Sequence, residues 1–183
     1  MKSTILAISV ALACTGAFAQ SNSKDDSTYI ELGYTSAQYN YDVVSGLSNA
    51  NHLMITLGKN ISANYAIEGV FANGMSDSTT TSPGFTVNAK LSSSYGLYFK
   101  PKAKVSDSVD VFARVGYFTA KPNITVPSDA TQNINYSGTS LSYGLGASLK
   151  ITNDIYGSLD WMQSYKKDGI DIKGVGLSVG YKY

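Results

Sequence analysis

The last ten residues of the chain, 174–183, alternate strictly between two kinds of side chain. One parity is apolar or aromatic and consists of Val175, Leu177, Val179, Tyr181 and Tyr183. The other parity holds only glycine, serine and one lysine. Because successive side chains of a strand point to opposite faces, this segment predicts a strand with one apolar and one small, polar face. The last residues of soluble domains are usually frayed and polar, so we expect the apolar face to meet something other than water.

Residues 1–19 have the pattern of a secretory signal peptide. Lys2 supplies the positive start and residues 5–13 form a short apolar core. Ala17 and Ala19 make a small-x-small cleavage site. The apolar core is too short to span a bilayer as a helix, so cleavage after residue 19 is predicted.

Cleavage leaves residues 20–183 as a single domain without cysteine. An alternative is lipidation of Cys14, but the leucine expected three positions before a lipoprotein cysteine is missing. The chain has 14 basic and 13 acidic residues, and loss of Lys2 balances them. Nothing in this charge pattern points to a nucleic-acid binder, which would carry a basic patch.

Segments with a period of two recur along the remaining chain. They cover residues 28–38, 52–60, 65–73, 89–102, 108–120, 136–150, 155–165 and 174–183. Short turns at 61–64, 105–107 and 152–154 alternate with longer connections at 39–50, 74–88, 121–135 and 166–172. No apolar stretch is long enough for a membrane-spanning helix, which leaves a closed barrel as the way to cross a membrane. We therefore predict an all-β fold, an eight-stranded antiparallel up-and-down transmembrane β-barrel.

A soluble, lipocalin-like barrel is the alternative, since its strands also alternate. In such a barrel the apolar residues point inward and the exterior is charged. Here the faces opposite the apolar ones carry mostly glycine, serine and isolated charges, which suit the narrow interior of an eight-stranded barrel. The 14 tyrosines also favour a membrane interface, where an apolar ring meets lipid and a hydroxyl meets water.

Three segments carry a resemblance to a known group of proteins. Residues 107–117 read DSVDVFARVGY, residues 142–147 read SYGLGA, and residues 174–183 close the chain. They resemble the small outer-membrane barrels of Gram-negative bacteria, namely the Ail/OmpX type, the opacity-like porins and the OmpA membrane domain. The resemblance implies a monomer in outer-membrane lipid and lipopolysaccharide. It also implies that the barrel-assembly machinery reads the apolar parity of the last strand, although these barrels more often end in Phe than in Tyr.

Six charged residues share the inward parity of the predicted strands. They are Glu31, Glu68, Lys100, Asp110, Arg114 and Asp160. Buried charges need partners, and Arg114 is expected at their centre because its guanidinium binds carboxylates in a bidentate manner. One interpretation is a structural ion-pair network that fills the barrel, and the other is an ion gate. We favour the structural network.

No catalytic or metal site can be assembled from the sequence. His52 is the only histidine, and a lipid-modifying barrel hydrolase needs a histidine together with a serine and an acid. We expect His52 to be a rim residue and predict no cofactor, no metal and no enzyme activity.

The outer loops are the remaining candidate surface, with Tyr39, Tyr41 and residues 76–82 and 122–134 as possible contacts for lipopolysaccharide, host ligands or phage. The predicted function is a structural, envelope-integrity or adhesin-like role. The alternatives are a small porin-like channel and a lipid-A-modifying enzyme.

Overall fold

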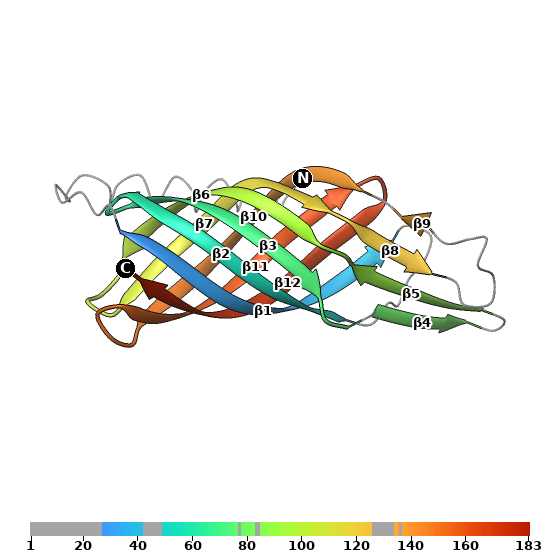
Figure 1. Cartoon of the computed structure of the whole chain (residues 1–183), viewed down its shortest axis with the longest axis horizontal. Helices are drawn as coiled ribbons and strands as arrows, with labels where there is room; N and C mark the ends of the chain where they lie inside the picture. The colour runs from blue at the N-terminus through green and yellow to red at the C-terminus, as the bar shows by residue number, and fades with distance from the viewer. Residues whose placement is uncertain (1–26, 42–48, 77, 83–84, 126–133, 136) are drawn as a thin grey trace.

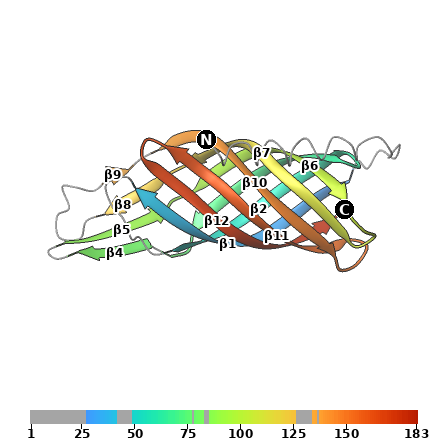
Figure 2. The same cartoon turned by 180° about the vertical axis from the view of Figure 1, so that it is seen from behind.

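The computed structural model describes residues 27–41, 49–76, 78–82, 85–125, 134–135 and 137–183. Within those ranges, no helix is long and apolar enough to cross a membrane. Eight long strands close into one antiparallel barrel in the order β1-β12-β11-β10-β7-β6-β3-β2 (Figures 1 and 2). Their bounds are β1 Thr28–Tyr41, β2 Ala50–Ser62, β3 Tyr65–Gly74, β6 Ser94–Lys104, β7 Val109–Ala120, β10 Gly138–Lys150, β11 Ile155–Lys167 and β12 Ile170–Lys182. The predicted fold class is confirmed.

The first and last strands of the chain close the barrel. β12 pairs with β1 so that Val179 lies opposite Leu32. The backbone N–H of Tyr183 donates to the Thr28 carbonyl at 2.9 Å, and the Thr28 N–H donates back at 3.2 Å. Closure leaves no strand edge in the wall, which satisfies the backbone hydrogen bonds that lipid cannot provide.

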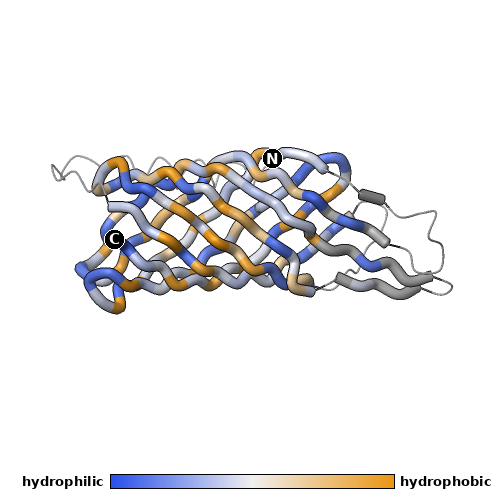
Figure 3. Tube along the Cα trace, in the orientation of Figure 1, coloured by the Kyte–Doolittle hydropathy of each residue, from blue (hydrophilic) through white to orange (hydrophobic). Residues whose placement is uncertain are grey.

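The outer face of the wall is apolar along each barrel strand. Leu97 of β6 and Leu177 of β12 are 64% and 63% exposed, and the same outward parity holds for Leu32, Ile55, Phe71, Leu141 and Leu159. Figure 3 shows hydrophobic positions recurring along the barrel strands. Such a surface is stable against lipid acyl chains and not against water, so the soluble barrel is excluded.

The two ends of the barrel differ. At the end that carries the chain terminus Tyr183, tight turns connect β2 to β3, β6 to β7 and β10 to β11 (Figure 1); we call this the turn end. At the opposite end a second sheet extends the wall, and we call this the sheet end.

The connection predicted at 166–172 is reduced to a two-residue turn. The segment 166–172 is not a loop, because β11 continues to Lys167 and β12 begins at Ile170. Asp168 and Gly169 form a two-residue turn with φ values of 53° and 75°. Positive φ at both central residues matches the right-handed twist of the flanking strands, and Asp-Gly is one of the pairs that adopt it readily.

The second sheet contains β4 Ser78–Ser82, β5 Phe85–Leu91, β8 Pro122–Thr125 and β9 Ile134–Asn135, in the order β4-β5-β8-β9. It projects beyond the barrel at the right of Figure 1. The predicted loops 74–88 and 121–135 therefore contain strands.

The single strand predicted over 89–102 is wrong, because β5 ends at Leu91 and β6 begins at Ser94. Leu91 has the same strand parity as the outward-facing Tyr95 and Leu97, which predicts an outward side chain, but it is 1% exposed. β5 leaves the barrel wall to pair with β8, where Leu91 lies opposite Pro122, and this change of partner turns its side chain inward.

Candidate functional site

Two tyrosines occupy the barrel interior near the turn end. Tyr29 of β1 and Tyr156 of β11 lie over Gly58 and Gly180, where an added Cβ would overlap the tyrosine rings. The two rings meet edge to face with their centroids 6.2 Å apart. The glycines thus provide the space in which both rings can cross the interior.

The hydroxyls of these tyrosines reach two buried carboxylates. Tyr29 donates to Glu68 Oε1 at 2.6 Å, and Tyr156 donates to Glu31 Oε1 at 2.8 Å. Glu31 and Glu68 are 2% and 0% exposed. Hydrogen bonds of this kind offset part of the cost of removing carboxylates from water.

Arg114 and Lys100 supply the positive charge. Arg114 donates from Nε to Glu68 at 2.5 Å, from one terminal nitrogen to Glu31 at 2.8 Å, and from the other to Asp160. Lys100 Nζ lies 2.7 Å from Glu68 and 3.2 Å from Glu31. We call Glu31, Glu68, Lys100, Arg114 and Asp160 the interior ion-pair network.

Asp110 is the one residue of the six expected charged residues that does not join the network. It precedes Arg114 by four residues on β7, which at strand spacing puts it about 13 Å closer to the turn end. There it lines an open cavity, with no ion pair to the network. Tyr29 and Tyr156 donate hydrogen bonds to this network. Sequence reasoning missed them, although their inward parity matches that of Glu31 and Asp160.

Apolar and aromatic side chains fill the interior toward the sheet end. This apolar plug consists of Tyr39, Leu91, Tyr98, Phe118, Met162, Tyr165, Ile170 and Ile172. Between the plug and Arg114, a cavity of about 20 Å³ is lined by Met54, Val70 and Tyr98 among others. That volume is close to the space of one water molecule, so the packing is nearly continuous from the network to the plug.

His52 lies inside the barrel and not on its rim as expected. It is 4% exposed, and its Nε2 is 2.7 Å from the Tyr39 hydroxyl, with the two rings edge to face. In the described part of the chain, no serine or carboxylate hydrogen-bonds to it. Tyr39, expected on an outer loop, is 1% exposed and belongs to this interior pair.

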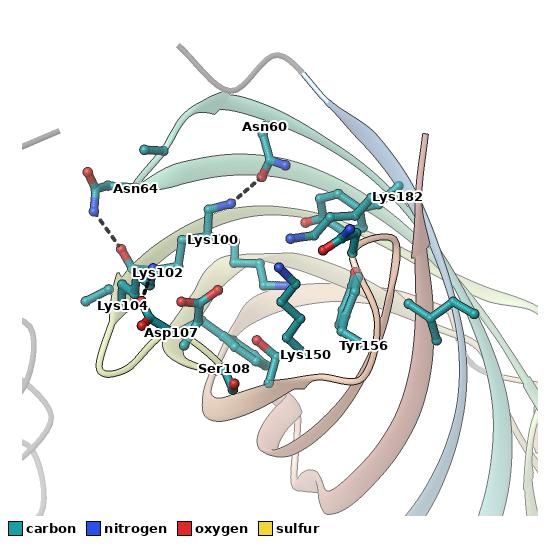
Figure 4. A pocket seen from close by; sticks show the side chains of 18 of the residues that line it. Asn60, Asn64, Lys100, Lys102, Lys104, Asp107, Ser108, Lys150, Tyr156 and Lys182 are labelled. Atoms are coloured by element: carbon teal, nitrogen blue, oxygen red, sulfur yellow. Dashed lines mark hydrogen bonds and ion pairs between the residues drawn. The ribbon is translucent and has the colours of Figure 1, made fainter. Parts of the chain in front are cut away.

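An open cavity of about 790 Å³ occupies the turn end, and we call it the vestibule (Figure 4). Its floor includes Tyr29, Phe112 and Tyr156, and four lysines line its wall and mouth, namely Lys102, Lys104, Lys150 and Lys182. At the mouth, Lys104 Nζ lies 2.9 Å from Asp107 Oδ1, and the hydrogen bond and charge of Lys104 lower the pKa of Asp107. Among the described residues, no cluster of His, Cys, Asp and Glu has the make-up of a metal site.

Solved structures give the same fold. Ail, the attachment invasion locus protein of Yersinia pestis, has a TM-score of 0.64 at 17% identity, with 87% of this chain and 99% of that chain covered. Neisserial surface protein A has a TM-score of 0.65 at 10% identity, covering 85% and 97%. The N-terminal β-barrel domain of Pseudomonas aeruginosa OprF has a TM-score of 0.60 at 12% identity, covering 87% and 98%. At these identities the likeness establishes the fold alone.

None of the curated proteins compared with the chain matches it in sequence. The model of the outer membrane protein beta-barrel domain, however, matches residues 5–183. The match spans nearly the whole chain and agrees with the closed barrel and its apolar outer face. The chain therefore belongs to the outer membrane protein beta-barrel domain family, whose barrels lie in the outer membrane of Gram-negative bacteria.

Proposed function

We propose that this protein is a closed outer-membrane scaffold that acts in envelope integrity or in surface attachment through its sheet end. The observation that carries the proposal is the pairing of a filled interior with a wall that continues as a four-stranded sheet beyond the barrel. A rigid scaffold that presents loops and strand ends is a common arrangement for binding surfaces. The name of Ail, an attachment protein with the same fold, is consistent with this role, as is its complex with a heparin analogue.

Replacing the β4–β5 hairpin tests the proposal. In a strain lacking the natural gene, residues 78–90 are replaced by a short Gly-Ser turn, and the full chain serves as the reference. We expect the variant to assemble in the outer membrane at the reference level, because β4 and β5 lie outside the barrel wall. Attachment to cell-coated surfaces, phage adsorption and resistance to large antibiotics are then measured. A variant that assembles and matches the full chain in all three assays contradicts the proposal.

A small porin-like channel is the second candidate. The vestibule favours it, because a polar cavity of about 790 Å³ opens at one end and leads inward to charged residues. The ion-pair network and the apolar plug beyond it argue against a continuous path. Recording in planar bilayers separates the two functions, because only a channel gives a steady conductance.

A lipid-A-modifying enzyme is the third hypothesis, and it requires His52. If overexpression alters lipid A and His52→Ala abolishes the change, the enzyme hypothesis is favoured over the scaffold. We expect no His52-dependent change, since the imidazole is engaged by Tyr39 inside the plug region.

The proposal includes three properties of the chain as exported. Residues 1–19, which lie outside the described residues, are removed as a signal peptide. The barrel-assembly machinery binds the last strand, and the folded barrel is a monomer in lipid and lipopolysaccharide. N-terminal sequencing of the membrane protein, which should begin at Gln20, tests the first property, and the mass of the detergent complex tests the monomer.

A further inference from the structure

The vestibule has an excess of positive charge. Lys102, Lys104, Lys150 and Lys182 line it, against Asp107 and Asp110, and Lys104 is paired with Asp107 at 2.9 Å. Lys100 lies at its inner end but is already paired with Glu31 and Glu68. Figure 4 shows the lysine side chains gathered around one opening, from strands β6, β10 and β12. Charge of one sign inside low-dielectric walls concentrates counter-ions in a cleft.

Two of these lysines are available to a ligand. Among the residues that the structure describes, no carboxylate lies within ion-pair distance of Lys150 or Lys182. Lys182 Nζ lies over the Tyr156 ring, 5.3 Å from its centroid, and this contact directs the ammonium group toward the interior. Lys102 differs, because its Nζ donates to Asn60 Oδ1 at 2.6 Å, which fixes it at the wall.

The remaining lining suits an anion with a compact body. The hydroxyls of Tyr29 and Tyr156 already donate to Glu68 and Glu31, so the floor offers ring faces and the Phe112 side chain. The positive groups that line the cavity are ammonium ions, which act as point charges. A phosphate with more than one negative charge can engage Lys150 and Lys182 together, whereas a single carboxylate brings only one negative charge. The volume of about 790 Å³ lies in the range of small-molecule sites.

From these observations we propose that the vestibule binds a phosphate-bearing anion presented from the periplasmic side. In this family the tight turns face the periplasm, so the ligand reaches the site without crossing the barrel. The phosphate belongs either to a soluble periplasmic compound or to the headgroup of an inner-leaflet phospholipid. The site goes beyond the proposed scaffold function, because it lies at the opposite end from the second sheet.

Calorimetric titration of the refolded full chain in maltoside micelles tests the proposal. The probes are inorganic tripolyphosphate and a water-soluble, short-chain phosphatidylglycerol. Short-chain phosphatidylcholine is the zwitterionic reference, because it carries a phosphate but has no net negative charge. We expect saturable binding of at least one anionic probe with a stoichiometry of one, weakened at least tenfold by 0.5 M salt. The probe that displaces the other identifies the source of the phosphate.

Two matched double variants localise the binding. Lys150→Gln with Lys182→Gln is expected to weaken binding at least tenfold. Lys166→Gln with Lys167→Gln removes the same charge at the sheet end, where both side chains are exposed, and is expected to change affinity less than twofold. Circular dichroism verifies that both variants fold. Equal weakening by the two pairs, or the absence of saturable binding to either anionic probe, overturns the proposal.

Discussion

Arg114 bonds to three carboxylates inside the barrel while only 5% of it is exposed. Removal of one member of a buried ion-pair network leaves uncompensated charge and costs about 3–5 kcal/mol. We expect Arg114→Leu to lower the free energy of unfolding by about that amount, measured by urea titration of the protein in lipid vesicles.

Asp110→Asn is the control, since it removes a carboxylate from the same strand outside the network. Its partly exposed position predicts a change within about 0.5 kcal/mol. If Arg114→Leu is no more destabilising than Asp110→Asn, the network does not stabilise the barrel.

The glycine beneath Tyr156 gives a second prediction for single residues. A Cβ at Gly180 would overlap the Tyr156 ring and push its hydroxyl away from Glu31, so Gly180→Ala should cost about 1–3 kcal/mol. Gly69→Ala is the matched control, because no atom lies within 4 Å of its added Cβ. Urea unfolding should show Gly69→Ala unchanged or slightly more stable; equal destabilisation by both would contradict the contact.

Strand parity predicts which charged side chains enter the barrel, but not which of them meet. Glu31 and Arg114 are 83 residues apart in sequence, and the registers of the intervening strands decide their contact. Composition alone does not single out Tyr29 and Tyr156, because abundant tyrosine is also expected at a lipid interface. Their place on the inward parity is the sequence signal that identifies them as interior groups.

At the scale of elements, the turn between β11 and β12 depends on one dipeptide. Gly169 has a φ of 75°. A residue with a Cβ in this left-handed conformation lowers the stability of the fold by about 1–2 kcal/mol. Gly169→Val is therefore expected to destabilise the barrel by about that amount, measured as a lower urea midpoint. Gly169→Asn also adds a Cβ but introduces a residue that tolerates positive φ, and it should lower the midpoint less; an equal loss in both variants would contradict the backbone argument.

The sequence predicts barrel strands well and the second sheet poorly, for a physical reason. Lipid on one face and a packed interior on the other impose apolar alternation on each barrel strand. The strands β4 and β5 lie outside the barrel and have no such requirement. β4 reads STTTS, and its β-branched threonines are a strand signal. Pro83 and Gly84, which follow it in the sequence, are a turn signal. The Asp168–Gly169 pair was a hairpin signal of the same kind.

The last strand gives a prediction about assembly. Tyr183 is held by backbone hydrogen bonds to Thr28, while its side chain is 67% exposed. Tyr183→Ala keeps these backbone hydrogen bonds and should refold normally in vitro. Because the variant lacks the aromatic side chain that we propose as an assembly signal, it should accumulate severalfold less in the outer membrane. Tyr117→Ala removes an equally exposed tyrosine from β7 and serves as control. Equal accumulation of the two variants would show that position 183 carries no special signal.

At the scale of the whole molecule, the interior has three layers along the barrel axis. The vestibule is open and positively charged, the ion-pair network fills the middle, and the apolar plug fills the sheet end. The eight-stranded wall makes this possible, because its interior is narrow enough for side chains to fill. The filled middle separates the vestibule from the sheet end. Each end can therefore bind its own ligand without a continuous path through the barrel.

This layering predicts the outcome of planar-bilayer recording. We expect no steady conductance from the refolded protein, and none from Arg114→Leu, because the plug around Tyr39 and Tyr165 stays in place when the network is broken. Tyr39→Ala with Tyr165→Ala should also stay closed, since the network still blocks the middle. A pore-forming protein added to the same bilayer shows that insertion is detected. Steady conductance of the unmodified protein, or conductance of Arg114→Leu without loss of stability, would identify the network as an ion gate and favour the channel over the closed scaffold.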